Sequence, residues 1–278
     1  MSARRNETRT AYLFLLPALV PLAVFVLYPV VNLFKVSLHR WNILKDQLTF
    51  VGLANYEALF AGGDFGRVVV NTLYYVAVTV PLGMALSLGL ALLLNQKIRG
   101  LGVLRTMVFT PVVTSTVAAG IVFVWLLDNP AWTAPRWLQS ETWAMPAVIL
   151  MTLWKQAGYN MVLFLAGLQG IPDMYYEAAA LDGAGKGWRA FRHVTWPLLW
   201  PTTFFVLVIS VIQAFRAFEP MYVMTRGGPV GSTSTLVYFI FEKAFRYGDM
   251  GQAAAASVLM TAVVLAITWL QFRVRGEE

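Results

Sequence analysis

The sequence contains no cysteine and only a small share of charged residues. The absence of cysteine excludes disulfides and thiol chemistry for all 278 residues. Charged residues amount to 13%, whereas soluble domains carry about 25%. Hydrophobic residues amount to 58%, so lipid is expected to be the main solvent of the folded chain.

Motifs for catalysis and for nucleic-acid binding are also missing. In Gly183-Ala-Gly-Lys-Gly187, Ala180 stands where a P-loop requires its first glycine, and Gly187 stands where it requires Ser or Thr. The two histidines, His39 and His193, fall on opposite sides of the membrane in the topology below, so they cannot share a metal ion. The net charge of +7 comes from cations at the ends of apolar runs, without the basic stripe typical of nucleic-acid binding. We therefore expect a non-catalytic chain without a cofactor or metal of its own.

The sequence does contain long apolar runs. A transmembrane helix needs about 20 mostly apolar residues, and six runs meet this length. The first run follows basic residues, as in a signal peptide, but it exceeds the roughly 7–15 apolar residues of such a peptide, so we expect it to be retained. The sequence predicts an all-α, polytopic membrane protein with one transmembrane domain over residues 1–278. Its expected spans are about 11–31, 69–94, 104–127, 144–168, 200–224 and 251–272.

The lysines and arginines between these runs predict the orientation of the chain. The N-terminal tail, the turn 95–105, the loop 169–199 and the C-terminal tail together carry 11 of them. The connections 32–68, 128–143 and 225–250 carry 8 over a greater total length. Because cytoplasmic connections are enriched in positive charge, we expect both termini and the loop 169–199 to lie in the cytoplasm.

The loop 170–199 is expected to form two short helices joined by a turn. Pro172 suits the first turn of a helix, where its missing N–H is not needed. Gly183 suits the position after the helix end, where a left-handed backbone favours glycine. Pro197 and Pro201 are expected to begin the next span as a new element. The sequence therefore predicts a helix–turn–helix element along the inner membrane surface.

A spaced motif lies in this loop, made of Glu177-Ala-Ala179, Asp182-Gly-Ala184, Phe191, Pro197 and Pro201. It resembles the EAA loop of permease subunits of bacterial ATP-binding-cassette (ABC) importers. Further segments resemble the carbohydrate-uptake branch of that family, which includes maltose-type and glycerol-phosphate-type importers, and the first of its two permease subunits. They are residues 51–56, 154–160, 225–236 and 244–256.

The resemblance implies a membrane subunit that works with partners. In that family two ATPase subunits bind ATP and Mg, an extracytoplasmic solute-binding protein delivers the solute, and a second homologous permease completes the path through the bacterial inner membrane. The EAA loop docks on the ATPase and drives alternating access. For this chain the implied ATPase-coupling residues are Glu177, Ala178, Ala179, Asp182, Gly183 and Ala184.

Four of these residues have more specific implied roles. Glu177 would pair with a basic group on the ATPase, and Asp182 would cap the second short helix. Ala178 and Ala179 would allow close approach. The alternative for the segment is a surface helix without a partner.

Ionisable residues inside apolar spans are costly, so they are candidates for function. Lys155 falls in the fourth expected span, and Arg216 and Glu219 fall in the fifth. Helical periodicity puts several polar side chains on the same faces of these spans. The resemblance places the substrate cavity between the two spans. The expected substrate-path residues are Thr152, Lys155, Gln156, Tyr159, Gln213, Arg216 and Glu219.

Three alternatives stay open at the level of the sequence. Lys155 or Arg216 either pairs with Glu219 and only orients the helices, or it contacts solute. Hydroxyls and amides suit a sugar or oligosaccharide, whereas two cations would suit glycerol 3-phosphate or a related phosphodiester. A self-contained secondary transporter is the alternative class, which would require paired halves with interrupted helices.

Overall fold

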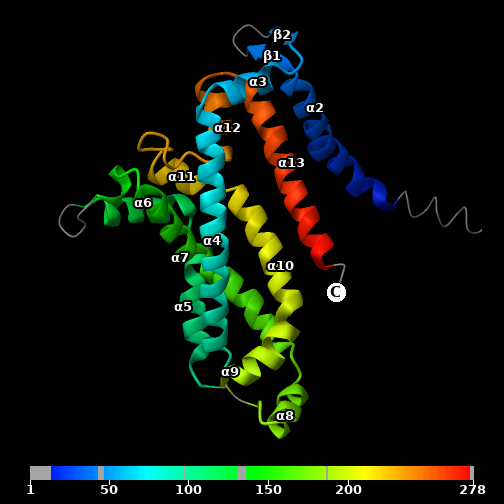
Figure 1. Cartoon of the computed structure of the whole chain (residues 1–278), viewed down its shortest axis with the longest axis vertical. Helices are drawn as coiled ribbons and strands as arrows, with labels where there is room; N and C mark the ends of the chain where they lie inside the picture. Colours follow the sequence, from blue (N-terminus) through cyan, green and yellow to red (C-terminus); the bar gives the residue numbers. More distant parts are fainter. Residues whose placement is uncertain (1–13, 43–46, 97, 130–135, 186, 276–278) are drawn as a thin grey trace, which may run out of the picture. The chain divides into compact units, whose positions relative to one another are not determined.

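The computed structural model describes residues 14–42, 47–96, 98–129, 136–185 and 187–275 (Figure 1). The predicted all-α membrane fold is confirmed: five of the described helices are long and apolar enough to span a membrane, and a bent pair makes six if it is one span. The chain divides into two compact units, Met1–Phe65 with Phe239–Val263 and Gly66–Tyr238 with Val264–Glu278. Residues 11–13 of the first expected span lie outside the described residues.

The first unit begins with a helix from Phe14 to Ser37 that includes the π-helical turn η1 (Ala23–Leu27) and α2 (Tyr28–Ser37). A β-hairpin follows, in which β1 (His39–Asn42) pairs antiparallel with β2 (Gln47–Phe50). The short helix α3 (Ala54–Ala61) comes next. The unit is completed by part of α12 (Leu236–Phe241), η4 (Glu242–Arg246) and the first part of α13 (Met250–Arg275).

Asn55 fastens α3 to the end of α2. Its side-chain amide donates hydrogen bonds to the carbonyls of Ser37 at 2.8 Å and His39 at 3.0 Å. Gly251, near the start of α13, lies so close that an added Cβ would be 2.6 Å from the His39 carbonyl. The turn after the first span is therefore held by hydrogen bonds from the Asn55 side chain to backbone carbonyls.

The second unit contains the helices that carry the predicted site. In chain order they are α4 (Asp64–Leu94), α5 (Leu101–Val113), α6 (Thr116–Leu127), η2 (Trp137–Gln139), α7 (Ala144–Gln169), α8 (Asp173–Leu181), α9 (Gly187–Ala190), η3 (Phe191–Thr195), α10 (Trp196–Phe215) and α11 (Glu219–Met224).

Helix α7 is the central helix of this unit. More than half of its most apolar stretch is buried, which is a larger share than in α4. Tyr75 of α4, Met151 of α7 and Phe215 of α10 belong to one buried cluster, each no more than 2% exposed. Ser87 of α4 donates a hydrogen bond to the Ala157 carbonyl of α7 at 3.1 Å. The site residues on α7 therefore rest on a well-packed helix.

The third expected span, 104–127, is not a straight helix. Helices α5 and α6 meet at a bend of 96°, with Thr114 and Ser115 extended between them (ψ 140° and 132°) (Figure 1). Pro111 in the last turn of α5 lacks an N–H, and the β-branched residues Val112, Val113 and Thr114 favour extended backbone. The prediction of a continuous span was wrong at this point.

The fifth expected span also differs at both ends. It was expected over 200–224, but α10 ends at Phe215 and the short α11 begins at Glu219. Pro220 lies in the first turn of α11, where it cannot donate a hydrogen bond back to α10. At the other end Gly187–Phe215 forms one helix, so Pro197 does not begin a new element.

A π-helical turn explains how this helix continues through Pro197. The backbone N–H of Trp196 donates to the Phe191 carbonyl five residues back, which shifts the hydrogen-bond register just before the proline. The same arrangement precedes Pro29, where the N–H of Tyr28 donates to the Ala23 carbonyl. In both places the π turn accommodates a proline that would otherwise break the helix.

Close packing of α7 against α5 depends on Gly158. An added Cβ would overlap the carbonyl oxygen of Val108 and lie 2.9 Å from the Cα atom of Phe109. These are backbone atoms and cannot move aside as a flexible side chain could. Substituting Gly158 therefore requires the two helices to separate.

Gly158→Ala is expected to destabilise the folded protein by about 1–3 kcal/mol, as other overpacked sites do. Thermal unfolding in detergent, followed by fluorescence-detected size exclusion, measures this loss. Gly89→Ala is the matched control, because Gly89 of α4 has no atom within 4 Å of an added Cβ. Equal melting temperatures for the two variants would contradict the packing described here.

Candidate functional site: a polar cleft between membrane helices

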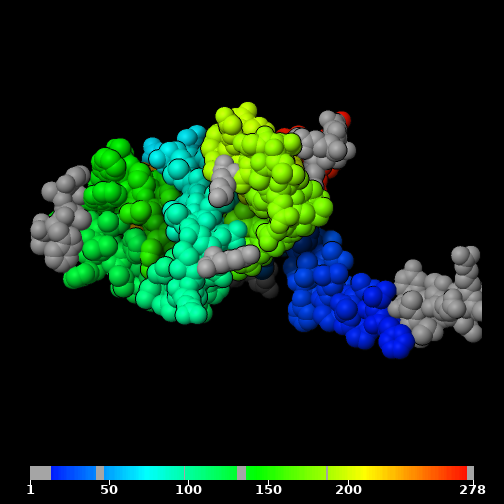
Figure 2. Space-filling view, turned by 90° about the horizontal axis from the view of Figure 1, so that it is seen from below, coloured from blue at the N-terminus to red at the C-terminus, as the bar shows by residue number. Residues whose placement is uncertain are grey.

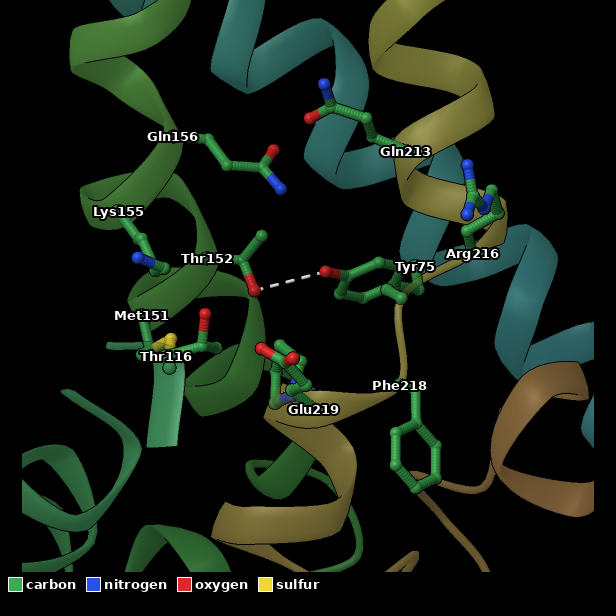
Figure 3. Close-up of a pocket in the computed structure, with 12 residues that line it drawn as sticks. Tyr75, Thr116, Met151, Thr152, Lys155, Gln156, Gln213, Arg216, Phe218 and Glu219 are labelled. Atoms are coloured by element: carbon green, nitrogen blue, oxygen red, sulfur yellow. Dashed lines mark hydrogen bonds between the residues drawn. The ribbon is translucent and has the colours of Figure 1, made fainter. Parts of the chain in front are cut away.

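All seven predicted substrate-path residues line one of two neighbouring clefts in the second unit (Figure 3). The larger, here the main cleft, has a volume of about 380 Å³. The smaller, here the side cleft, has a volume of about 270 Å³ and shares three residues with the first. The main cleft is lined by Tyr75, Thr116, Met151, Thr152, Lys155, Gln156, Gln213, Arg216, Ala217, Phe218, Glu219 and Pro220, and the side cleft by Val112, Lys155, Gln156, Tyr159 and Gln213.

Helices α7 and α10 supply most of the neutral polar groups of the clefts. Thr152, Gln156 and Tyr159 follow one face of α7, as their spacing predicted. Gln213 comes from the last turn of α10, and in Figure 3 its amide and that of Gln156 extend into the space between the two helices. The clefts therefore offer several donors and acceptors without charge.

Arg216 and Glu219 reach the main cleft because α10 ends early. Arg216 is the C-terminal cap of α10, and Glu219 is the first residue of α11. Both side chains are exposed in a turn and are not inside a continuous helix as expected. Among the described residues, no ion pair within 4.0 Å joins Lys155 or Arg216 to Glu219. The pairing considered from the sequence is thus not present.

Lys155 instead binds the end of α5. Its ammonium group donates hydrogen bonds to the carbonyls of Pro111 at 3.3 Å, Val112 at 3.4 Å and Thr114 at 2.5 Å. These carbonyls lie at the negative end of the α5 dipole, where a helix leaves its last carbonyls without the usual partners. The Pro111 carbonyl also accepts a hydrogen bond from the Thr114 N–H at 3.2 Å. The charge of Lys155 is therefore largely taken up by the protein.

Sequence reasoning missed Tyr75, which lies on the wall of the main cleft. Its side chain is fully buried, and its hydroxyl donates a hydrogen bond to Thr152 Oγ1 at 3.1 Å (Figure 3). Thr152 in turn donates to the Val148 carbonyl at 2.9 Å. A tyrosine within the apolar run of α4 gave no signal that separates it from an ordinary core residue. The hydrogen bond fixes the rotamer of Thr152 at the cleft.

The neighbouring Trp154 of α7 does not line either cleft. Its ring packs against Phe123 of α6, with 5.4 Å between the ring centroids. Tyr159, which is 38% exposed in the side cleft, is thus the aromatic side chain of α7 that is available to a solute.

The second predicted site, the EAA segment, forms α8 and the turn after it. Its helix ends as the glycine predicted: Gly183 is left-handed (φ +75°), and Ala184 and Gly183 donate to the carbonyls of Ala179 at 2.7 Å and Ala180 at 3.2 Å. This pair of hydrogen bonds is a Schellman motif. Nothing lies within 4 Å of an added Cβ at Gly183, so glycine is favoured there by the left-handed backbone and not by close packing.

Helix α8 is exposed along its whole length. None of its residues is buried, and Leu181 is 92% exposed. Figure 2 looks onto this end of the second unit, where the yellow-green surface of the loop is open to the viewer. Glu177 and Ala178 are exposed on it, and Ala179 is partly buried. An exposed helix with apolar side chains is typical of a surface that a partner covers.

The role expected for Asp182 in capping the second helix is wrong. Asp182 is the C-terminal cap of α8, and α9 begins only at Gly187, so Asp182 is too far away to be its N-cap. The two arms of the loop are instead joined by a hydrogen bond of 3.0 Å between the hydroxyls of Tyr176 and Thr195.

Apolar helices that surround an open polar cleft, together with the exposed helix α8, are typical of a membrane transport protein. The comparisons with known proteins agree. Residues 79–275 match the family described as "Binding-protein-dependent transport system inner membrane component". The chain belongs to this family and is a permease component of such a system.

Relatives in the family cover almost the whole chain. The arabinooligosaccharides transport system permease protein AraP of Bacillus subtilis is 34% identical over 98% of this chain and 90% of its own length. The trehalose/maltose transport system permease protein MalF of Thermococcus litoralis is 34% identical over 97% and 94%. The sn-glycerol-3-phosphate transport system permease protein UgpA of Agrobacterium fabrum is 34% identical over 94% and 93%.

A solved structure shares the fold. The crystal structure of a bacterial ABC transporter involved in the import of the acidic polysaccharide alginate contains a chain that matches with a TM-score of 0.85 and 22% identity, covering 99% of this chain and 98% of that one. A second structure, of an alginate ABC transporter in complex with its pentasaccharide-bound periplasmic protein, matches with a TM-score of 0.82 and 22% identity over 98% and 95%.

Tyr75→Phe is expected to reduce the free energy of unfolding by about 0.5–1.5 kcal/mol, because a buried hydrogen bond is lost. Combining it with Thr152→Val should cost less than the sum of the single changes, since both remove the same bond. Thermal denaturation of the four proteins in detergent gives the cycle. Tyr74→Phe, at an exposed neighbouring tyrosine, is the control. Strict additivity would argue that the hydrogen bond contributes nothing.

Proposed function

We propose that this chain forms half of the solute path of an ATP-driven importer for a sugar or oligosaccharide. The observation that carries the proposal is the main cleft, in which amides and hydroxyls from α4, α6, α7 and α10 gather inside an apolar helix bundle. In the proposed mechanism the cleft opens alternately to the two sides of the membrane. A solute-binding protein delivers the solute, and a second homologous permease supplies the other half of the path.

The chemistry of the clefts favours an uncharged solute. Gln156, Gln213 and Tyr159 offer hydrogen-bonding groups that match sugar hydroxyls, and the Tyr159 ring offers an apolar face. The ammonium group of Lys155 is engaged with three carbonyls, and Arg216 shares the main cleft with Glu219. The charge of Lys155 is therefore engaged within the protein, and Glu219 adds a negative charge to the same cleft that would disfavour a phosphate group.

Glycerol 3-phosphate or a related phosphodiester is the second candidate solute. The observation in its favour is the exposed guanidinium group of Arg216, together with the likeness to UgpA. Uptake of labelled maltooligosaccharides and of labelled glycerol 3-phosphate by vesicles that contain the whole transporter separates the two candidates.

Coupling to ATP hydrolysis is proposed to occur through α8. The exposure of α8 and its glycine-terminated end support this role. Glu177 would pair with a basic group of the ATPase, and Ala178, Ala179 and Ala184 would allow its surface to come close. ATP and Mg would be bound by two ATPase partners, so this subunit itself would hold no cofactor and catalyse no reaction.

The proposed setting is the bacterial inner membrane, with both termini and α8 in the cytoplasm. A self-contained secondary transporter is the alternative class. Purification from native membranes distinguishes the two: recovery of two ATPase copies and a second permease supports the importer, whereas uptake that needs no ATPase supports the alternative.

Gly183→Val is expected to lower solute-stimulated ATPase activity at least tenfold without preventing membrane insertion. A β-branched residue is strained at a positive φ, so the end of α8 must change shape. Gly183→Asn is the matched control, because asparagine tolerates this backbone conformation, and it should retain most of the activity. The ATPase activity of the reconstituted transporter measures both. Equal losses in the two variants would show that the left-handed turn is not what matters.

Gln213→Ala and Tyr159→Ala are expected to raise the KM for uptake about 5- to 100-fold, since each removes contacts worth about 1–3 kcal/mol to a bound sugar. Trp154→Ala, on the same helix but outside both clefts, serves as the control. Initial uptake rates in vesicles measure the change. Unchanged uptake by both cleft variants would mean that the solute takes another path.

A further inference from the structure

Lys155 is the one Lys, Arg, Asp or Glu residue of α7, and its three hydrogen bonds all run to another span. They reach across 41 to 44 residues of sequence to the last turn of α5 and the residue after it. A lysine that contacted solute would need free donors directed into the cleft. Here the donors are directed to backbone carbonyls at a helix end.

The bend between α5 and α6 creates the need for these donors. Where a helix stops, its last four carbonyls lack intrahelical partners. In a membrane no water is at hand to bind them unless the protein provides a polar site. Thr114 Oγ1 donates to the Thr110 carbonyl at 3.3 Å, and the Thr114 N–H donates to the Pro111 carbonyl at 3.2 Å. Lys155 adds a second donor to Pro111 and binds the carbonyls of Val112 and Thr114. The interaction therefore stabilises the bend itself.

The bend also determines the wall of the main cleft. Thr116, the first residue of α6, lines the cleft. Helix α6 then packs closely on α11, because an added Cβ at Gly120 would lie 2.8 Å from Val223. Helix α11 begins with Glu219 and Pro220, which line the same cleft. Movement of the α5 end would thus be passed to two walls of the cleft.

We propose that Lys155 is a positioning residue, which shapes the solute path through the α5–α6 bend and does not itself bind solute. This inference rests on the proposed function of the main cleft as the solute path. It departs from the expectation that Lys155 is a substrate contact or an ion-pair partner. Its removal should loosen α6 relative to α7, and a loosened wall should bind solute more weakly.

The absence of cysteine allows a direct test by spin labelling. Ile121 on α6 and Val162 on α7 are 59% and 41% exposed, so both can be changed to labelled cysteines. The label–label distance distribution is measured by double electron–electron resonance in the assembled transporter, with partner cysteines replaced. Lys155→Met should broaden it at least twofold, and Lys155→Arg, which keeps charge and donors, should restore a narrow distribution.

Uptake kinetics of the same proteins separate a positioning role from direct contact. Lys155→Met should raise the KM for the transported sugar about tenfold with kcat within about twofold, and Lys155→Arg should recover the KM. Thr116→Ala should raise the KM less in the Lys155→Met protein than in the otherwise unchanged protein, because loss of Lys155 has already displaced the wall that carries Thr116. Lys155→Gln, whose amide has two N–H donors and no charge, gives intermediate broadening and serves if the methionine variant does not assemble.

An unchanged distance distribution in Lys155→Met overturns the proposal, whether the KM rises or not. A raised KM with an unchanged distribution would assign Lys155 to direct solute contact. Failure of the proposed function is recognised separately: if Gln213→Ala and Tyr159→Ala leave uptake unchanged, the cleft is not the path, while the label distances still decide whether Lys155 holds the bend.

Discussion

The backbone carbonyls and amides at interrupted helices are the constraint on which this structure depends. A helix in lipid can stop only where its freed polar groups find partners within the protein or line a polar cavity. The second unit stops helices at the end of α5, which borders the side cleft through Val112, and at the end of α10, which borders the main cleft through Arg216. At the end of α5 the partner is a lysine from another span. The helix ends therefore lie where polar groups are gathered, and the same polar groups line the clefts.

The same constraint takes a different form in the loop that carries the EAA motif. There water is available, so α8 can end in a local motif of backbone hydrogen bonds around Gly183. None of the side chains of α8 is buried, and most of them are exposed. Helix α10, by contrast, continues into the loop without interruption, because a π-helical turn carries it past Pro197. The loop thus combines one helix that ends at Gly183 with another that continues into the apolar helix α10.

Much of the fold could be predicted from the sequence because its signals are local. Apolar length indicates a span, glycine indicates the end of α8, and a period of 3.6 residues places Thr152, Gln156 and Tyr159 on one face. The structure brings all seven expected path residues to the clefts, although their contact with solute stays a prediction.

The features that the sequence did not reveal depend on distant partners. The bend at Thr114 follows Pro111 by three residues, but prolines also lie inside α4 and α10, which continue, and the lysine partner of the bend comes from a different span. Tyr75 looks like an ordinary core residue until its hydroxyl is seen beside Thr152. Asp182 was expected to cap the second short helix. That helix begins only at Gly187, and no local signal in the sequence marks this start. Continuity through Pro197 depends on a change of hydrogen-bond register that residue types alone do not specify.

That continuity has a mechanical consequence. Helix α10, from Trp196 to Phe215, has 20 residues, so at 1.5 Å per residue it is about 30 Å long. It begins directly after Thr195, whose hydroxyl is hydrogen-bonded to that of Tyr176 on α8, and it ends next to Arg216 at the cleft. Tilting it by about 5° displaces its far end by about 2.6 Å, close to the diameter of a water molecule. A modest push on the loop therefore has enough reach to change the width of the cleft.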